Sequence, residues 1–271
     1  PTLVPQPRLI NALSLNGIAI NGTRLLLPAG VGIALGVTSP GWAYVALSII
    51  FVGNQFITSK LHLPPVQGRE RGRSMLAELW EGLRFAGGNA DVLAVLTVAV
   101  GVQGIGFASR ALIPVFAAER LGAGPGAYGL LLSADGAGAV IFGLVLASVG
   151  LGKRRGLMMV LFSAVNAVGI LIVGWTSWIV VAALVSMTVG GTSTVFRSAS
   201  NSLLLGNTPP HMRGRIMSIN GLNPGIAPIS IAIAGAIAEA TNVSIAMTVI
   251  GGGSLLLNGL AIFLHRRLLR L

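Results

Sequence analysis

The hydrophobic residues of this chain fall into long uninterrupted runs separated by short polar connections. Eight of these runs are long enough to cross the hydrocarbon layer of a membrane, which takes roughly 20 helical residues. They occupy residues 12–37, 42–58, 92–116, 128–149, 157–175, 178–205, 216–238 and 243–264. A closed β-barrel is disfavoured, because the runs lack apolar/polar alternation and are about twice as long as a barrel strand. The pattern predicts an all-α polytopic membrane protein with about eight transmembrane helices.

The connections predict how the helices are grouped. Those at residues 38–41, 176–177 and 239–242 are so short that the helices they join must be antiparallel neighbours. The one long connection, residues 59–91, carries apolar residues at helical spacing, with Glu78 and Glu81 on the other face. This pattern predicts an amphipathic helix at the cytoplasmic membrane surface, with a solvated linker as the alternative. We therefore divide the chain into two helices (1–58), a cytoplasmic linker (59–91) and a six-helix bundle (92–271).

Composition and charge support a membrane location. Hydrophobic residues make up 54% of the 271 residues and charged residues 9%, against about 25% charged in soluble domains. The net charge of +11 would indicate nucleic acid in a soluble protein. Here 14 of the 18 Lys and Arg residues lie in connections on one side of the predicted membrane, and only Arg120 lies on the other. The positive-inside rule then places both chain ends in the cytoplasm, beside anionic lipid, and we expect no nucleic-acid partner.

An internal match links the two ends of the chain. The motif Ser14-Leu15-Asn16-Gly17 recurs 204 residues later as Ser218-Ile219-Asn220-Gly221, and Asn54 matches Asn258 at the same offset. A chance match is one interpretation. The other is a parallel repeat of a helix pair, as in transporters built from two similar halves. Because four helices precede the second copy after the linker and none precedes the first, the repeat implies a parent of twelve helices with four at its front outside this chain.

This architecture, together with local motifs, resembles the major facilitator superfamily. The run PPHMRGRIMS at residues 209–218 resembles the loop between helices ten and eleven in exporters similar to enterobactin exporters and transmembrane secretion effectors. Residues 3–13 resemble the entry into helix five of that branch, and residues 79–89 its central-loop helix. The resemblance implies a partial major facilitator fold, with the last two helices of the N-terminal bundle and the six-helix C-terminal bundle.

The resemblance also implies a function. We expect a secondary active exporter in the bacterial cytoplasmic membrane, moving a small amphipathic or anionic molecule by alternating access, with an ion gradient, of protons among others, as the driving force. The alternative is a non-transporting membrane scaffold or a transporter remnant, because four helices of the parent are missing. Membrane lipid is the other expected partner.

Two loop motifs of the superfamily are degraded here. In the helix-five motif Pro28 and Gly32 remain, but Leu27 and Val31 stand where glycines are expected, which weakens the case for proton antiport. The basic loop after helix eight keeps its Lys and Arg residues, but Val149 stands near the place of its acidic residue. The residues that we assign to conformational motif loops are Pro28, Gly32, Lys153, Arg154, Arg155, Arg213, Gly214 and Arg215.

Polar residues inside the predicted spans are candidates for a transport pathway, because burying them in lipid is costly. Arg24 lies near the middle of its span with Asn16 and Asn21 on nearby turns, and we expect it to contact an anion or the substrate. The alternative is a hydrogen bond to carbonyl groups of a neighbouring helix. Gln103 and Asn166 are expected either to line a cavity or to bridge helices; Gln103 is included among the pathway residues.

Arg110 and Asp135 are expected to form an ion pair. At 1.5 Å per residue both lie about 10 Å below the outer surface, on consecutive antiparallel helices. Two roles stay open: a permanent structural pair, or a device in which protonation of Asp135 breaks the pair and couples transport to protons. For Arg197, near the cytoplasmic end of its span, an interfacial position is favoured over a site role.

The sequence argues against an enzyme. His62, His211 and His265 all fall in cytoplasmic connections, and Asp91 and Asp135, the only aspartates, lie at opposite membrane faces. Neither a serine–histidine pair nor an aspartyl pair can therefore form within the membrane. The chain has no cysteine and no phosphate-binding loop motif, and we predict no cofactor and no metal site.

Overall fold

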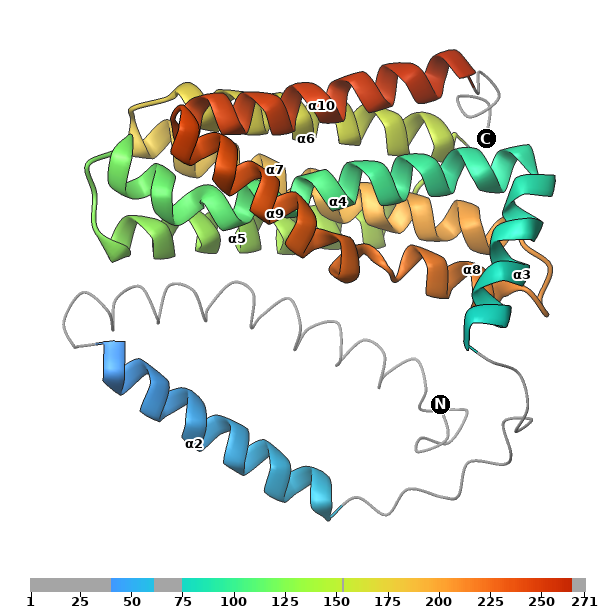
Figure 1. The fold of residues 1–271 in the computed structure, drawn as a ribbon, viewed down its shortest axis with the longest axis horizontal. Coiled ribbons are helices and arrows are strands. Elements are labelled where there is room, and N and C mark those ends of the chain that lie inside the picture. Colours follow the sequence, from blue (N-terminus) through green and yellow to red (C-terminus); the bar gives the residue numbers. More distant parts are fainter. Residues whose placement is uncertain (1–39, 61–74, 153, 265–271) are drawn as a thin grey trace.

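A computed structural model describes residues 40–60, 75–152 and 154–264 of the chain, and Figure 1 shows its fold. Every regular element in these residues is a helix, which confirms the predicted all-α class. The helices are α2 (Pro40–Ser59), α3 (Met75–Gly88), α4 (Ala90–Glu119), α5 (Pro125–Val149), α6 (Arg155–Trp175), α7 (Ile179–Gly206), α8 (Arg213–Asn220), α9 (Asn223–Ala240) and α10 (Val243–Leu264).

The last six predicted spans are confirmed. In the described residues six helical stretches are long and apolar enough to cross a membrane: Ala90–Glu119, Pro125–Val149, Arg155–Trp175, Ile179–Gly206, Arg213–Ala240 and Val243–Phe263. The predicted span at 42–58 is the helix α2, whose apolar part, Tyr44–Ser59, is shorter than the other six. The predicted span at 12–37 lies outside the described residues.

The outer surface of the bundle is apolar, as lipid contact requires. Leu144, Leu161 and Leu256 point outward with 68%, 52% and 76% of their surface exposed. Buried polar residues, among them Asp135, Ser163 and Asn258, lie inside. The buried positions are mostly apolar too, so the bundle differs from a water-soluble protein in its apolar outer surface.

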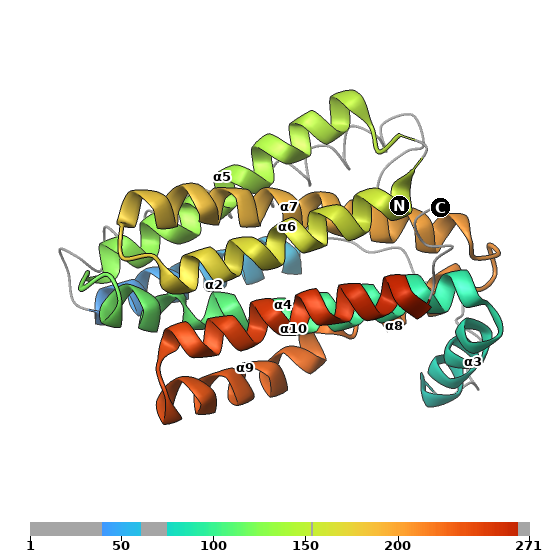
Figure 2. The ribbon, with the colours of Figure 1, turned by 90° about the horizontal axis from the view of Figure 1, so that it is seen from above.

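The helices of the bundle pack side by side in a few main contacts (Figures 1 and 2). Helices α5 and α6 both pack on α7, and α10 packs on α4, α6 and α9. The short connections at 176–177 and 239–242 join α6 to α7 and α9 to α10, and each of these pairs is in contact, as predicted. The connection at 38–41 begins outside the described residues.

Glycines let α5 and α7 approach almost backbone to backbone. A methyl group added at Gly138 of α5 would overlap the carbonyl oxygen of Met187 in α7. One added at Gly190 of α7 would overlap the carbonyl oxygen of Asp135 in α5. Small residues at helix contacts of this kind are the usual packing device inside membranes, where apolar side chains alone give helices little reason to leave lipid. The contact fixes Asp135 against α7.

The predicted span 216–238 is not one continuous helix. It is divided into α8, which ends at Asn220, and α9, which begins at Asn223. Pro224 explains the break, because proline has no N–H for a helical bond to Asn220 and its ring would clash with that carbonyl. The two helices meet at a bend in Figure 1.

The linker helix is present and packs on the bundle. α3 contacts α8, and Glu81 of α3 forms an ion pair of 2.9 Å with Arg215 of α8. Trp80 and Leu83 on α3 are exposed, as expected of an amphipathic helix at a membrane surface.

Asn89 separates α3 from α4. Its side-chain oxygen accepts hydrogen bonds from the backbone N–H groups of Asp91 and Val92, both at 3.2 Å. The division into residues 1–58, 59–91 and 92–271 stays a prediction.

The apolar core is divided into two clusters along the bundle. One lies near α3 and α8 and includes Val95, Met159 and Phe196. The other lies toward the opposite end and includes Phe116, Leu131 and Met247. On α4 the first cluster ends at Val102 and the buried part of the second begins at Ala108. The polar residues of the bundle concentrate between the two clusters, and there the candidate site lies.

Candidate functional site

A polar cavity of about 110 Å³ lies between α4, α6 and α7. Because a single water needs about 10–15 Å³ on this measure, the cavity has room for several waters or for one small chemical group. Most of its polar lining comes from three short segments, one on each helix. The polar residues that line it are Gln103, Ser109, Arg110, Ser163, Asn166, Ser193, Thr194 and Arg197.

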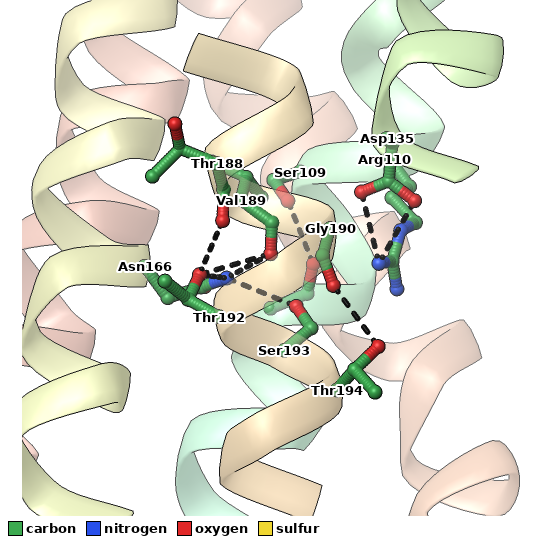
Figure 3. Close-up of polar contacts among 11 residues, drawn as sticks. Ser109, Arg110, Asp135, Asn166, Thr188, Val189, Gly190, Thr192, Ser193 and Thr194 are labelled. Carbon is green, nitrogen blue, oxygen red and sulfur yellow. Dashed lines mark hydrogen bonds and ion pairs between the residues drawn. The ribbon is translucent and has the colours of Figure 1, made fainter. Parts of the chain in front are cut away.

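Arg110 and Asp135 form the predicted ion pair. The Nη2 atom of Arg110 donates to both carboxylate oxygens of Asp135, at 3.1 and 3.3 Å, and Figure 3 shows the two side chains facing each other from neighbouring helices. The Asp135 side chain is 9% exposed and that of Arg110 is 29% exposed. The pair therefore offsets much of the cost of placing either charge at this depth.

Arg110 borders two cavities. A second cavity of about 30 Å³, toward the end of the bundle away from α3, is lined by Asp135, Ser186 and Met247 among others. Both cavities share Ser109, Arg110 and Val189 in their linings. Arg110 thus lies where the two cavities adjoin.

Asn166 joins α6 to α7 beside the larger cavity. Its Nδ2 atom donates to the carbonyl oxygen of Val189 at 2.9 Å, to Thr192 Oγ1 at 3.2 Å and to Ser193 Oγ at 2.9 Å (Figure 3). The sequence left open whether Asn166 lines a cavity or bridges helices. The structure shows that it does both.

A second polar contact joins α6 to α10. Ser163 Oγ and Asn258 are buried and hydrogen-bonded at 2.9 and 2.7 Å, and Asn258 also donates to the carbonyl oxygen of Ser254. The internal sequence match singled out Asn258, and the structure gives it a packing role. Its counterpart Asn54 lies on α2 with its side chain exposed.

A comparison with family models identifies the family. The model of the transmembrane secretion effectors matches residues 1–271. The chain belongs to this family of the major facilitator superfamily. The secretion-effector chain is thus an integral membrane protein of a transporter family, and membership points to a transporter rather than an enzyme. No curated protein matches the chain.

The larger cavity includes one residue for which the sequence predicted another position. Arg197 does not lie at the end of its span, because α7 continues for nine residues beyond it, to Gly206, and Arg197 lines the same cavity as Arg110. A helix that ends near Phe196 would have favoured the interfacial interpretation, and α7 does not end there. Ser193 and Thr194 were also missed. The available signal was the polar run TSTVFRSASNS at residues 192–202, unusual within an apolar helix.

Among the predicted pathway residues, the structure brings three together. Arg110 lines both cavities, Gln103 lines the larger and Asp135 the smaller. Arg24, Asn16 and Asn21 lie outside the described residues, so their role stays a prediction. The same holds for the helix-five motif residues Pro28 and Gly32.

The basic loop residues Arg155 and Arg213 hold helix ends together. Arg155 Nη1 donates to Ser202 Oγ of α7 at 2.9 Å. Arg213 Nε donates to the carbonyl oxygens of Leu205 and Thr208, at 3.1 and 3.2 Å, where α7 ends. The Arg213 contact places a cation where the end of α7 leaves carbonyl groups unpaired.

The remaining loop residues differ in their surroundings. Arg215 forms the ion pair with Glu81. Arg154 and Gly214 are exposed, and Lys153 lies outside the described residues. A metal site is not indicated, since no group of three or more potential metal ligands occurs in the part of the chain that the structure describes.

Proposed function

We propose that the chain acts in the secondary active export of a small molecule by alternating access. The observation that supports this most is the charged cavity between two apolar clusters of a membrane bundle. Such a cavity costs stability in a protein that only needs to span a membrane. A midplane site where helices meet is typical of secondary transporters.

In this proposal α4, α6 and α7 form one wall of the pathway. The other wall belongs to the helices of residues 1–58, with Arg24, Asn16 and Asn21 facing the cavity. Rocking of the two walls about the cavity exposes it to each side of the membrane in turn. The apolar clusters at either end of the six-helix bundle move as rigid bodies, because close-packed cores resist continuous deformation.

Asp135 is the proposed coupling group, and the proton the proposed coupling ion. Protonation would remove the negative charge opposite Arg110 and free the guanidinium, which borders both cavities. Release of one charged partner changes the relative free energies of the two access states, which is what coupling requires. In the alternative a permanent pair only stabilises the bundle.

We further propose that both chain ends lie on the cytoplasmic side of a bacterial membrane. Arg84, Arg154, Arg155, Arg213 and Arg215 are all found near the end of the bundle formed by α3 and α8. Basic residues at the ends of spans favour the cytoplasmic side. There they also lie next to anionic lipid headgroups, and Trp80 and Leu83 of α3 are exposed toward the same region.

Comparison of excreted metabolites tests the proposal. Cells that express the full-length protein are compared with cells that express the Asp135→Asn and Glu119→Gln variants, and their media are compared by mass spectrometry. Glu119 is exposed at the far end of α4 and serves as the matched control. We expect a compound that leaves cells only when the protein is present. Its export should be lost with Asp135→Asn, kept with Glu119→Gln and lost when a protonophore collapses the proton gradient.

Two other outcomes would contradict the proposal in different ways. A medium unchanged by the protein would favour the non-transporting scaffold. Export that survives both Asp135→Asn and the protonophore would reject the assignment of Asp135 and of protons as the driving ion.

A further inference from the structure

The larger cavity carries an excess of positive charge. Arg110 and Arg197 both line it, and its lining contains no acidic residue. Arg110 is matched by Asp135, which borders the neighbouring cavity. Arg197 has neither an ion-pair partner nor a hydrogen-bond partner among the residues that the structure describes.

Arg197 lies inside α7 and not at its end. It lies 18 residues after Ile179 and nine before Gly206, or about 27 Å and 13 Å along the helix axis at 1.5 Å per residue. The residue is exposed and not packed into the apolar core, and a charge inside a membrane bundle is costly unless it meets water or a partner of opposite sign. A second guanidinium group in the same cavity raises that cost, because like charges repel more strongly where water is scarce.

The neighbouring polar groups are mostly hydrogen-bond donors. Ser193 Oγ accepts from Asn166, so its own hydroxyl hydrogen stays available to a ligand. The Nε atom of Arg110 is buried without a hydrogen-bond partner. Gln103 adds an amide whose NH₂ group can donate. An anion would match all of these donors, whereas a cation would face two guanidinium groups.

We propose that this cavity binds an acidic group of the transported molecule, a carboxylate, sulfonate or phosphate, and that Arg197 is its principal contact. This inference rests on the proposed export function and names the class of substrate. A volume of about 110 Å³ suits the acidic group with its nearest atoms.

Binding of two nearly isosteric probes tests the proposal without knowledge of the natural substrate. Benzoate and benzamide differ mainly in charge, and each is titrated against the purified full-length protein in phosphatidylcholine nanodiscs by following the midpoint of thermal unfolding. We expect benzoate to stabilise the protein and benzamide not to. Arg197→Gln should weaken benzoate binding by about tenfold or more, as expected for the loss of a charge-assisted hydrogen bond, and Arg197→Lys by less.

Arg120→Gln is the matched control, because Arg120 is an exposed arginine beside Trp175, outside the cavity. It should leave benzoate binding unchanged. Equal effects of benzoate on the wild type and on Arg197→Gln, or equal binding of benzamide, would overturn the proposal.

An anionic lipid headgroup also carries an acidic group. One further experiment distinguishes binding of a soluble acid from binding of lipid. Replacing part of the phosphatidylcholine by phosphatidylglycerol should leave benzoate binding to the wild type unchanged if the site serves soluble acids. Competition by phosphatidylglycerol that Arg197→Gln removes would support the acidic site but assign it to lipid. Failure of the export proposal would look different. Specific benzoate binding without any exported compound would support the acidic site and contradict the proposed transport.

Discussion

At the scale of single residues, the Arg110–Asp135 pair shows how a charged group is kept inside an apolar bundle. Two hydrogen bonds join the Nη2 atom of Arg110 to the carboxylate. The pair sits between two cavities, so its strength bears both on stability and on the proposed coupling. Removing one partner leaves the other charge without compensation, which usually costs more than removing both.

A double-mutant cycle measures this coupling. We expect Arg110→Gln and Asp135→Asn each to lower the free energy of unfolding by about 1–3 kcal/mol, because each leaves a charge at membrane depth with no partner. The double variant should lose less than the sum of the two, by about 0.5–3 kcal/mol. Denaturation of the purified proteins in one detergent provides the values. Strict additivity would show that the pair contributes nothing as a pair.

At the scale of helices, the α5–α7 contact depends on the absence of side chains. Gly138 and Gly190 each face a backbone carbonyl of the other helix, and backbone cannot move aside as a flexible side chain can. The same contact presses Asp135 toward α7. The packing of α5 therefore determines where the carboxylate meets Arg110.

Alanine substitutions at two glycines of α5 distinguish the effect of helix packing on stability from the effect of helix propensity. Gly138→Ala should destabilise the bundle by about 1–3 kcal/mol or more, since overpacking forces backbone shifts. Gly143→Ala should be neutral or stabilise by up to about 1 kcal/mol, because its added carbon would meet only Thr194 Cγ2 at an ordinary 3.8 Å. The midpoints of thermal unfolding of the two purified variants are compared with that of the wild type. Equal midpoints would mean that α5 and α7 are not in close contact.

The docking of the linker helix α3 on α8 is testable by cross-linking. A Cβ atom at Gly82 would lie 3.4 Å from the Cβ atom of Arg215, close to the 3.5–4.5 Å typical of disulfides. The Gly82→Cys/Arg215→Cys double variant should therefore form a disulfide on mild oxidation, seen as loss of maleimide labelling. The control is Gly88→Cys/Arg215→Cys, because Gly88 is on the same helix with nothing within 4 Å. Equal cross-linking of both pairs would argue against the docked α3.

At the scale of the whole molecule, the sequence predicted the number and the bounds of the later spans well. Apolar runs are a direct consequence of contact with lipid, so the six membrane-spanning stretches between Ala90 and Phe263 follow from local sequence alone. The Arg110–Asp135 pair was predictable for a similar reason. The depth of each residue on two antiparallel neighbouring helices follows from its number of residues from the membrane surface, so Arg110 and Asp135 could be matched without the structure.

What escaped prediction depends on contacts between distant helices. Arg197 reaches the cavity because of the rotation of α7, and that rotation is fixed by packing of Gly138 and Gly190 between α5 and α7. The periodicity of the sequence does not predict this rotation. The break between α8 and α9 was missed although Pro224 marks it, because hydrophobicity continues through the break and the span was judged by hydrophobicity.

The central claim is that the cavity between α4, α6 and α7 lies on a pathway open to each side of the membrane in turn. Reactivity of a single cysteine tests it most directly. The printed chain has no cysteine, so in a full-length protein freed of any others Ser193→Cys is a unique probe. Leu144→Cys is the control, since Leu144 is on the outer surface of α5, where lipid excludes water.

The rate of reaction with a membrane-impermeant thiol reagent is measured in vesicles of both orientations, with and without an imposed proton gradient. The account predicts that Ser193→Cys reacts from both sides, that the gradient changes the two rates in opposite directions, and that Leu144→Cys stays unreactive. Reaction of Ser193→Cys from neither side, or no faster than that of Leu144→Cys, would contradict it.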